Sequence, residues 1–370
     1  MVDFFSRLPA RKSVFSPWLA VAAAFLFCVA MAAWAAPSAA SGKALRIYFV
    51  DVEGGQATLF VTPQQSLLVD TGWPGFNGRD ADRIAAAAKK AGISKIDYVL
   101  ITHFHTDHVG GLPQLAARIP IGAFLDHGNN RESSDAPTVA GWKAYQQLVA
   151  SGKYKRITLK PGDTLPVKGL QATVISSDGA LIAHPLAGAG GENSYCKGAE
   201  HYAPDQTENA RSLGILIHFG KLRILDLGDL TKDKEAELMC PVNKLGKVDI
   251  YIVSHHGWSQ SSSPELVDAI APRVSIMDNG AKKGGTPSTW DIVSKSPGLE
   301  NLWQLHFSDE GGPAHNEPAQ YIANPEGPDA GHYLELTARP DGSFAVFNSR
   351  TDKTRRYAAA RGGSSNQGGR

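Results

Sequence analysis

Hydrophobic positions recur along the chain with two periods, and the two alternate from about residue 45 onward. A strand places successive side chains on opposite faces, whereas apolar residues three or four apart share one helix face. Alternating or β-branched apolar segments predict strands at 45–50, 57–61, 66–69, 96–102, 121–125, 172–175, 213–219, 222–227, 249–254 and 274–277. Helical spacing predicts helices at 80–91, 111–118, 142–150, 232–239 and 264–270, with Gly92 as a stop signal for the first. This order predicts an α/β fold that ends in a hairpin over 332–347.

The first forty residues have a different pattern, which is typical of a targeting signal. Arg7, Arg11 and Lys12 precede an apolar run over 18–34, and Ala33-Trp34-Ala35 has small residues at the spacing of a signal-peptidase site. An uncleaved anchor is the alternative, because the run is near the shortest that spans a bilayer. We expect an exported, periplasmic or secreted protein with a signal over 1–35, a linker over 36–44, one domain over 45–350 and a flexible tail over 351–370.

Composition and charge exclude some classes of protein. The chain has 370 residues, 42% of them hydrophobic, which argues against a disordered chain. Its 37 Lys and Arg against 36 Asp and Glu give no strong signal for nucleic-acid binding. No second apolar stretch is long enough to cross a membrane, and the sequence does not indicate an oligomeric state. Cys196 and Cys240 remain after the expected signal; we predict a disulfide between them, with two unrelated thiols as the alternative.

One short motif, His103-Phe104-His105-Thr106-Asp107-His108, carries most of the candidate chemistry. It directly follows a predicted strand, so that His103 and His105 point the same way and can share one metal ion. Asp107 and His108 can then turn toward a second ion. Imidazole and carboxylate ligands suit zinc, and also iron or manganese.

This motif resembles the metallo-β-lactamase fold superfamily, and the resemblance extends along most of the chain. The segments 50–57 and 67–72, Asn209, Ser212 and the segments 228–229 and 254–257 are similar to the metallo-hydrolase domain of competence (DNA-uptake) proteins. The resemblance implies an αββα sandwich, in which two mixed β-sheets are flanked by helices and the metals lie at one edge. The resemblance says little about the substrate, since one fold hosts many reactions.

The resemblance also implies roles for individual residues. His103 and His105 would bind the first metal, Asp107 and His108 the second, and Asp229 would bridge the two. The cofactors would be two divalent ions, with zinc expected and manganese or iron as alternatives.

Further positions follow from the same resemblance. His255 is preferred over His256 as the last ligand of the second metal, and His256 would contact substrate or act as an acid. Asp70 would orient the metal loop by hydrogen bonds. The third histidine of the first site is missing, because Asn209 stands at its position. His201, His184, His306 and His127 are other candidates, each expected more often as a loop or core residue.

Metal-assisted hydrolysis is the expected reaction, with Asp107 orienting a water molecule and taking its proton. We expect phosphodiester-type or other small-molecule substrates, and Lys282-Lys283 could contact a phosphate or simply form a solvated turn. The alternatives are a periplasmic β-lactamase-like amide, ester or lactone hydrolase, and a non-catalytic binding module that retains the fold. We expect the segment after residue 277 to complete the second sheet.

Overall fold

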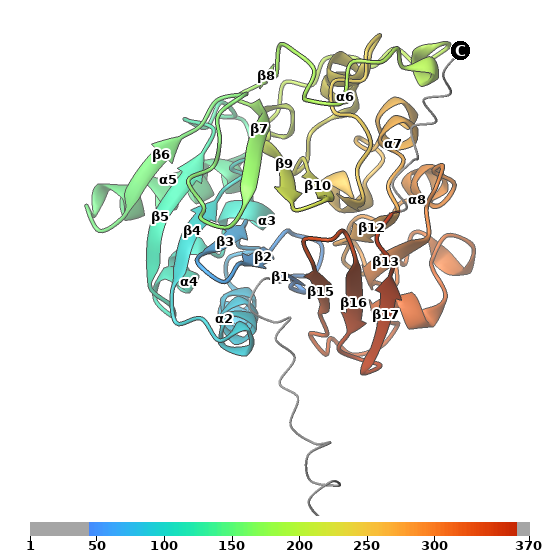
Figure 1. Ribbon diagram of the computed structural model, residues 1–370. Coiled ribbons are helices and arrows are strands. Elements are labelled where there is room, and N and C mark those ends of the chain that lie inside the picture. The colour runs from blue at the N-terminus through green and yellow to red at the C-terminus, as the bar shows by residue number, and fades with distance from the viewer. Residues whose placement is uncertain (1–43, 361–370) are drawn as a thin grey trace, which may run out of the picture. The chain divides into compact units, whose positions relative to one another are not determined.

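The computed structural model describes residues 44–360 (Figure 1). The predicted signal peptide, nearly all of the linker and the last ten residues of the predicted tail lie outside the described residues. The described residues, 44–360, lie within one compact unit. Within the described part of the chain, no helix combines the length and the apolar character that a membrane crossing needs.

Two mixed β-sheets form the centre of this unit (Figure 1). The first contains, in spatial order, β17 (Lys353–Tyr357), β16 (Phe344–Asn348), β15 (Leu334–Ala338), β1 (Leu45–Phe49), β2 (Thr58–Val61), β3 (Ser66–Val69), β4 (Ile96–Leu100), β5 (Ile121–Asp126) and β6 (Lys155–Thr158). The second contains β14 (Ile322–Asn324), β13 (Asn301–His306), β12 (Val274–Met277), β11 (Ile250–Ile252), β10 (Leu222–Asp226), β9 (Gly214–Phe219), β7 (Gln171–Ser177) and β8 (Ala180–Leu181). Strands β3 to β6 and β10 to β14 run parallel.

Helices cover the outer face of each sheet. The helices are α2 (Arg79–Ala91), α3 (Thr106–Val109), α4 (Leu112–Ala116), α5 (Ala136–Ala150), α6 (Lys232–Met239), α7 (Pro264–Ile270) and α8 (Pro287–Ser294). Side chains of α2, α4 and α5 pack with the outer side chains of the first sheet, and those of α6 and α7 with the second. A third cluster lies between the sheets, with side chains from both.

The residues of β9 show why the sheets are buried on both sides. Ile215 and Ile217 face the first sheet, whereas Leu216 between them packs in the helix-covered cluster. All three are almost inaccessible to solvent. A strand covered on both faces reads as a continuous apolar run, which is the pattern of this segment. The expected αββα sandwich with two mixed sheets is confirmed.

The C-terminal segment differs from the expectation in two ways. Only β13 and β14 extend the second sheet, whereas the hairpin β15–β16 pairs with β1 and extends the first. Residues 353–357, expected in a flexible tail, form β17 at the edge of that sheet. The sequence Lys-Thr-Arg-Arg-Tyr lacks an apolar pattern because an edge strand is solvated, and charges there discourage pairing with other chains.

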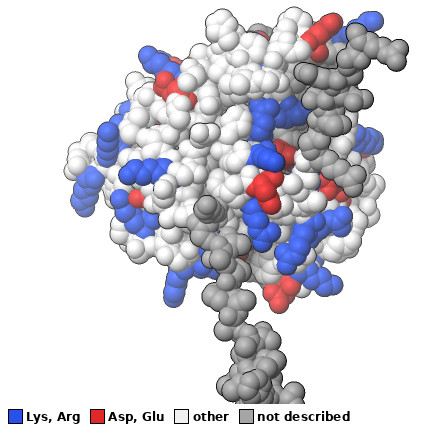
Figure 2. All heavy atoms as spheres, in the orientation of Figure 1, with Lys and Arg blue, Asp and Glu red and all other residues white. Residues whose placement is uncertain are grey.

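Charged side chains of both signs are interspersed on the face of the molecule in view in Figure 2. Lys and Arg are more frequent than Asp and Glu in this view, and they are scattered over the face rather than gathered in one patch.

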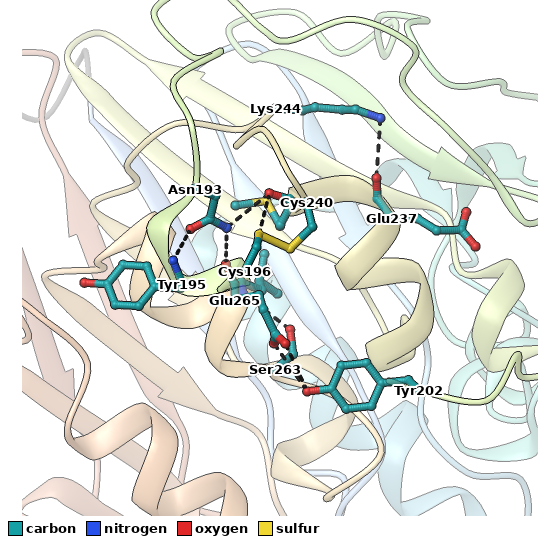
Figure 3. Close-up of a disulfide and its surroundings, with 11 residues drawn as sticks. Asn193, Tyr195, Cys196, Tyr202, Glu237, Cys240, Lys244, Ser263 and Glu265 are labelled. Carbon is teal, nitrogen blue, oxygen red and sulfur yellow. Dashed lines mark hydrogen bonds between the residues drawn. A yellow bond between two sulfur atoms is a disulfide. The ribbon is translucent and has the colours of Figure 1, made fainter. Parts of the chain in front are cut away.

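A disulfide joins Cys196 to Cys240, 44 residues apart (Figure 3). Cys196 ends a short 3-10 helix, Ser194–Cys196, and Cys240 directly follows α6. Beside this bond, Asn193 Nδ2 donates to the carbonyl oxygens of Met239 and Glu265. The disulfide therefore fastens the long segment between β8 and β9 to the end of α6, and Asn193 connects the same segment to α7.

Candidate metal centre

The expected metal residues lie at the carboxyl ends of β4, β10 and β11. The loop after β4 carries His103 and His105 and continues into α3, which carries Asp107 and His108. Asp229 follows β10, and His256 lies in a 3-10 turn, Ser254–Gly257, after β11. Loops at the carboxyl ends of strands are the usual place for sites in sheets with parallel strands. The topology thus gathers residues that are up to 153 positions apart.

Four buried side chains form a compact group of metal-type ligands: Asp107, His108, Asp229 and His256. One ligand atom from each lies within 4.8 Å of the others. His108 Nε2 is 3.2 Å from Asp229 Oδ2 and 3.3 Å from Asp107 Oδ2. His256 Nε2 is 3.2 Å from Asp107 Oδ2 and 3.5 Å from Asp229 Oδ2. Two imidazoles and two carboxylates at this spacing fit one divalent ion.

His103 lies beside this group, with its ring centroid 4.1 Å from that of His108. Its Nδ1 is 3.0 Å from Thr102 Oγ1, whereas its Nε2 is buried without a hydrogen-bond partner among the described residues, 3.9 Å from Asp229 Oδ2. Asp229 Oδ1 is likewise buried and unpaired. Buried polar atoms normally have partners, so these two atoms fit a further ion that the same carboxylate would share.

His105 is partly exposed, and its ring centroid is 4.7 Å from that of His103. Its Nε2 lies 3.0 Å from Glu132 Oε2, and the same oxygen accepts a hydrogen bond from the backbone N–H of Glu208. Because Nε2 faces a carboxylate, Nδ1 is the nitrogen that remains for a metal. Sequence reasoning missed Glu132, since no motif marks its loop and its partner is a tertiary neighbour.

Asp70 forms hydrogen bonds to the loop that carries the histidine motif. Its Oδ2 lies 2.7 Å from His108 Nδ1 and accepts a hydrogen bond of 2.6 Å from Thr102 Oγ1. Its Oδ1 accepts from the backbone N–H of Thr102. A carboxylate beside Nδ1 keeps the proton on that nitrogen, so Nε2 of His108 is the nitrogen that faces the group and is available to a metal once it has lost its own proton.

The geometry favours His256, rather than the expected His255, as the histidine of the four-residue group. His255 Nε2 lies 3.3 Å from Asp229 Oδ2, and its Nδ1 lies 3.3 Å from Ser261 Oγ. Both histidines have positive φ angles, 56° and 54°, an uncommon conformation outside glycine. The tight turn brings both imidazoles to Asp229, and the spacing of adjacent histidines could not distinguish them.

The charges within the four-residue group shift the pKa values of its members. Burial is the largest single influence and opposes the charged form of each residue, but the oppositely charged neighbours together have the larger effect. The pKa values of Asp107 and Asp229 fall well below their usual range, and that of His108 rises well above its own. The pKa of His256 rises to about 10, whereas burial lowers that of His255 to about 4. A metal bound here would therefore replace protons held by the imidazoles of the group.

The other candidate residues lie in different surroundings. Asn209 is buried, and its Oδ1 has no hydrogen-bond partner among the described residues. His306 belongs to a separate group, 2.6 Å from Asp51 Oδ1 and 3.9 Å from Glu53 Oε1. His127 Nε2 lies 3.0 Å from Glu208 Oε2. His184 and His201 are exposed. Among the described residues, no hydrogen bond or ion pair joins any of these four histidines to the central group.

Comparisons with known proteins point in the same direction. Residues 50–199 match the family model described as the Metallo-beta-lactamase superfamily. ComE operon protein 3 of Bacillus subtilis is 26% identical over 191 residues, 51% of this chain and 20% of that protein. Recombination protein 2 of Haemophilus influenzae is 24% identical over 233 residues, 62% of this chain and 24% of that protein. The matches thus span about a fifth to a quarter of these relatives.

Among solved structures, the metallo-beta-lactamase fold protein YhfI from Bacillus subtilis is 13% identical. The alignment covers 70% of this chain and 95% of that one, with a TM-score of 0.44.

Proposed function

We propose that this chain, which is a metallo-hydrolase of the metallo-beta-lactamase superfamily, uses a dinuclear metal centre to hydrolyse phosphodiester-type substrates. The buried group of Asp107, His108, Asp229 and His256 carries the proposal. Its four ligand atoms lie close to one another in the interior of the protein. Burying two carboxylates and two imidazoles together is costly, and a bound metal ion would offset that cost. The substrate and the number of ions are the parts that go beyond family membership.

We assign the candidate ligands to two ion positions. Asp107, His108 and His256 would hold one ion, and His103 and His105 the other. Asp229 has one oxygen facing the first set and an unpaired second oxygen, so it would be shared. When bound, divalent ions lower the pKa of a water molecule and polarise the bond under attack.

The chain's own side chains would orient the reactants. Asp107 Oδ2 lies within 3.3 Å of two imidazoles and can accept a proton from water. His255 lies beside Asp229, its ring centroid is 5.7 Å from that of the exposed Trp258, and it is therefore placed to contact substrate. It would take the role expected for His256. Asp70 and Glu132 would keep His108 and His105 oriented.

Export to the periplasm or the exterior remains part of the proposal. The Cys196–Cys240 disulfide supports it, because such bonds persist mainly in oxidising compartments. The N-terminal pattern of basic, apolar and small residues supports it independently.

Parallel assays test the reaction class. We expect zinc- or manganese-loaded protein to hydrolyse bis(p-nitrophenyl) phosphate faster than a chromogenic cephalosporin. Asp229→Ala should abolish the activity, whereas His201→Ala, a change at an exposed histidine, should leave it unchanged. Faster cephalosporin cleavage would replace the phosphodiester proposal with a β-lactamase-like one. Metal binding without any turnover would favour a binding module.

A further inference from the structure

A lysine reaches into the metal centre from the second sheet. Lys283 lies on the loop between β12 and α8, and its Nζ contacts Asp107 Oδ2. The side chain is only 20% exposed. Its neighbour Lys282 is exposed, and among the described residues no hydrogen bond or ion pair joins it to the central group. Of the pair that sequence reasoning treated as a phosphate contact or a solvated turn, only Lys283 meets the site.

The backbone fixes this lysine against the centre. Gly284 has a φ of +80°, and a Cβ there would lie 2.1 Å from the carbonyl oxygen of His256. Gly285 N–H donates to that same oxygen, and Thr286 N–H donates to the carbonyl oxygen of Gly257. On the other side, a Cβ on Gly54 would lie 2.9 Å from the Cβ of Lys283. The loop is thus locked to the turn that carries His256.

Two tryptophans flank the ammonium group. Lys283 Nζ lies 5.0 Å from the ring centroid of Trp73 and 6.0 Å from that of Trp258. Trp258 is 38% exposed, an unusual exposure for so large an apolar side chain, and Trp73 is partly exposed. Aromatic faces attract a cation, and they also offer a surface on which a flat or apolar group can pack.

Charge balance indicates what this arrangement recognises. Lys283 forms an ion pair with Asp107. Two divalent ions would outweigh the charges of Asp107 and Asp229, and Lys283 would then add a further positive charge beside them. A buried cation is stable there only with a new anionic partner.

We propose that Lys283, held between Trp73 and Trp258, binds the anionic group of the substrate and leaves Asp107 when the metal centre is filled. This inference rests on the proposed metallo-hydrolase function and restricts its substrates to anions that carry a flat or apolar group. Trp258 would contact that group, because it is the more exposed ring.

Calorimetric titration tests the inference without requiring turnover. The probes are inorganic phosphate and phenyl phosphate, added to zinc-loaded wild type, Lys283→Ala, Lys283→Gln, Lys283→Arg and the matched control Lys282→Ala. We expect both neutral variants to bind phenyl phosphate roughly tenfold to a hundredfold more weakly, because a charge-assisted hydrogen bond is lost. Lys283→Arg and Lys282→Ala should stay within about threefold of wild type. Trp258→Ala should weaken phenyl phosphate binding more than inorganic phosphate binding.

Metal content and thermal melting of each variant show that the centre and the fold are intact. Equal phenyl phosphate affinity in Lys283→Ala, Lys283→Gln and Lys282→Ala would overturn the inference. So would wild-type protein that binds neither probe. Tight binding that depends on Lys283, combined with no hydrolysis of any ester, would instead contradict the proposed function and leave the anion site standing.

Discussion

Each imidazole of the candidate metal centre has two nitrogens, and a carboxylate outside the ligand set lies beside the second nitrogen of three of them. For His256 Nδ1 this carboxylate is Asp278, with Oδ1 at 3.3 Å. Asp70 lies 2.7 Å from His108 Nδ1, and Glu132 lies 3.0 Å from His105 Nε2. Asp70 could be identified from the sequence, because its Asp-Thr-Gly segment resembles a known motif. Glu132 was not visible, because nothing local links it to His105. The ligand types could be predicted from spacing, but their supporting partners depend on tertiary packing.

Glu132 gives a prediction at this scale. Glu132→Gln should weaken metal binding at the position held by His103 and His105 by about 10- to 100-fold, as loss of an orienting carboxylate does in other metal sites. Competition with a chromogenic chelator measures it. Glu200→Gln, at an exposed glutamate, is the control. Unchanged affinity for every bound ion in Glu132→Gln would show that this contact does not orient His105.

At the scale of elements, the helices with clear stop signals were the most predictable. The expected helix over 80–91 is α2, and Gly92 caps it with a φ of +78°. The expected helix over 142–150 is α5, which begins earlier because Asp135 caps it and Pro137 lies in its first turn. Strand β17 was missed, because a solvated edge strand carries no apolar alternation.

The disulfide closes a loop of the chain and stabilises the folded state. By the loop-entropy argument, removing it lowers the free energy of unfolding by about 2–5 kcal/mol. Guanidinium unfolding of wild type and of a Cys196→Ser/Cys240→Ser variant, each with and without reductant, checks this value. Reductant should destabilise wild type and leave the variant unchanged. A wild-type curve that does not respond to reductant would mean that the bond contributes nothing.

A buried glutamate on α6 makes stability depend on pH. Burial raises the pKa of Glu235 from 4.5 to about 7, although the backbone N–H groups of Ser262 and Ser263 donate to its carboxylate. Between these two values the folded chain keeps a proton that the unfolded chain has lost. The free energy of unfolding therefore falls as pH rises through this window, by about 3 kcal/mol in total.

Urea unfolding at pH 5 and pH 8 measures this contribution. Glu235→Gln cannot titrate at this position, so its loss of stability between the two pH values should be smaller than that of wild type. Glu237→Gln on the exposed face of the same helix should behave as wild type. The same pH dependence in both variants would place the titrating group elsewhere.

At the scale of the whole molecule, the sandwich follows from strands that are apolar on both faces. Leu216 and Ile217 are neighbours in sequence, yet they lie in two different cores. Such runs require cover on both sides, and the alternation of strands with helices supplies it. Which sheet the last hairpin joins could not be predicted, because pairing of β15 with β1 joins strands at opposite ends of the domain.

The same architecture brings loops from both sheets to one centre. His103 and Asp107 come from the first sheet, and Asp229, His256 and Lys283 come from the second. A site that bridges two sheets depends on their packing, so its local motifs could be found in the sequence while its geometry could not. The near-zero net charge of the chain also conceals the local charge, since Lys283 lies beside a carboxylate of the central group.

The stoichiometry of bound metal tests the account most directly. Wild-type protein, loaded with zinc or manganese and freed of unbound ions, should retain two ions per chain by elemental analysis. Asp229→Ala should lose them, because we propose that this carboxylate serves both positions, while His201→Ala should retain them. Wild type without bound metal, or Asp229→Ala with the same metal content as wild type, would contradict the assignment of this group as a dinuclear centre.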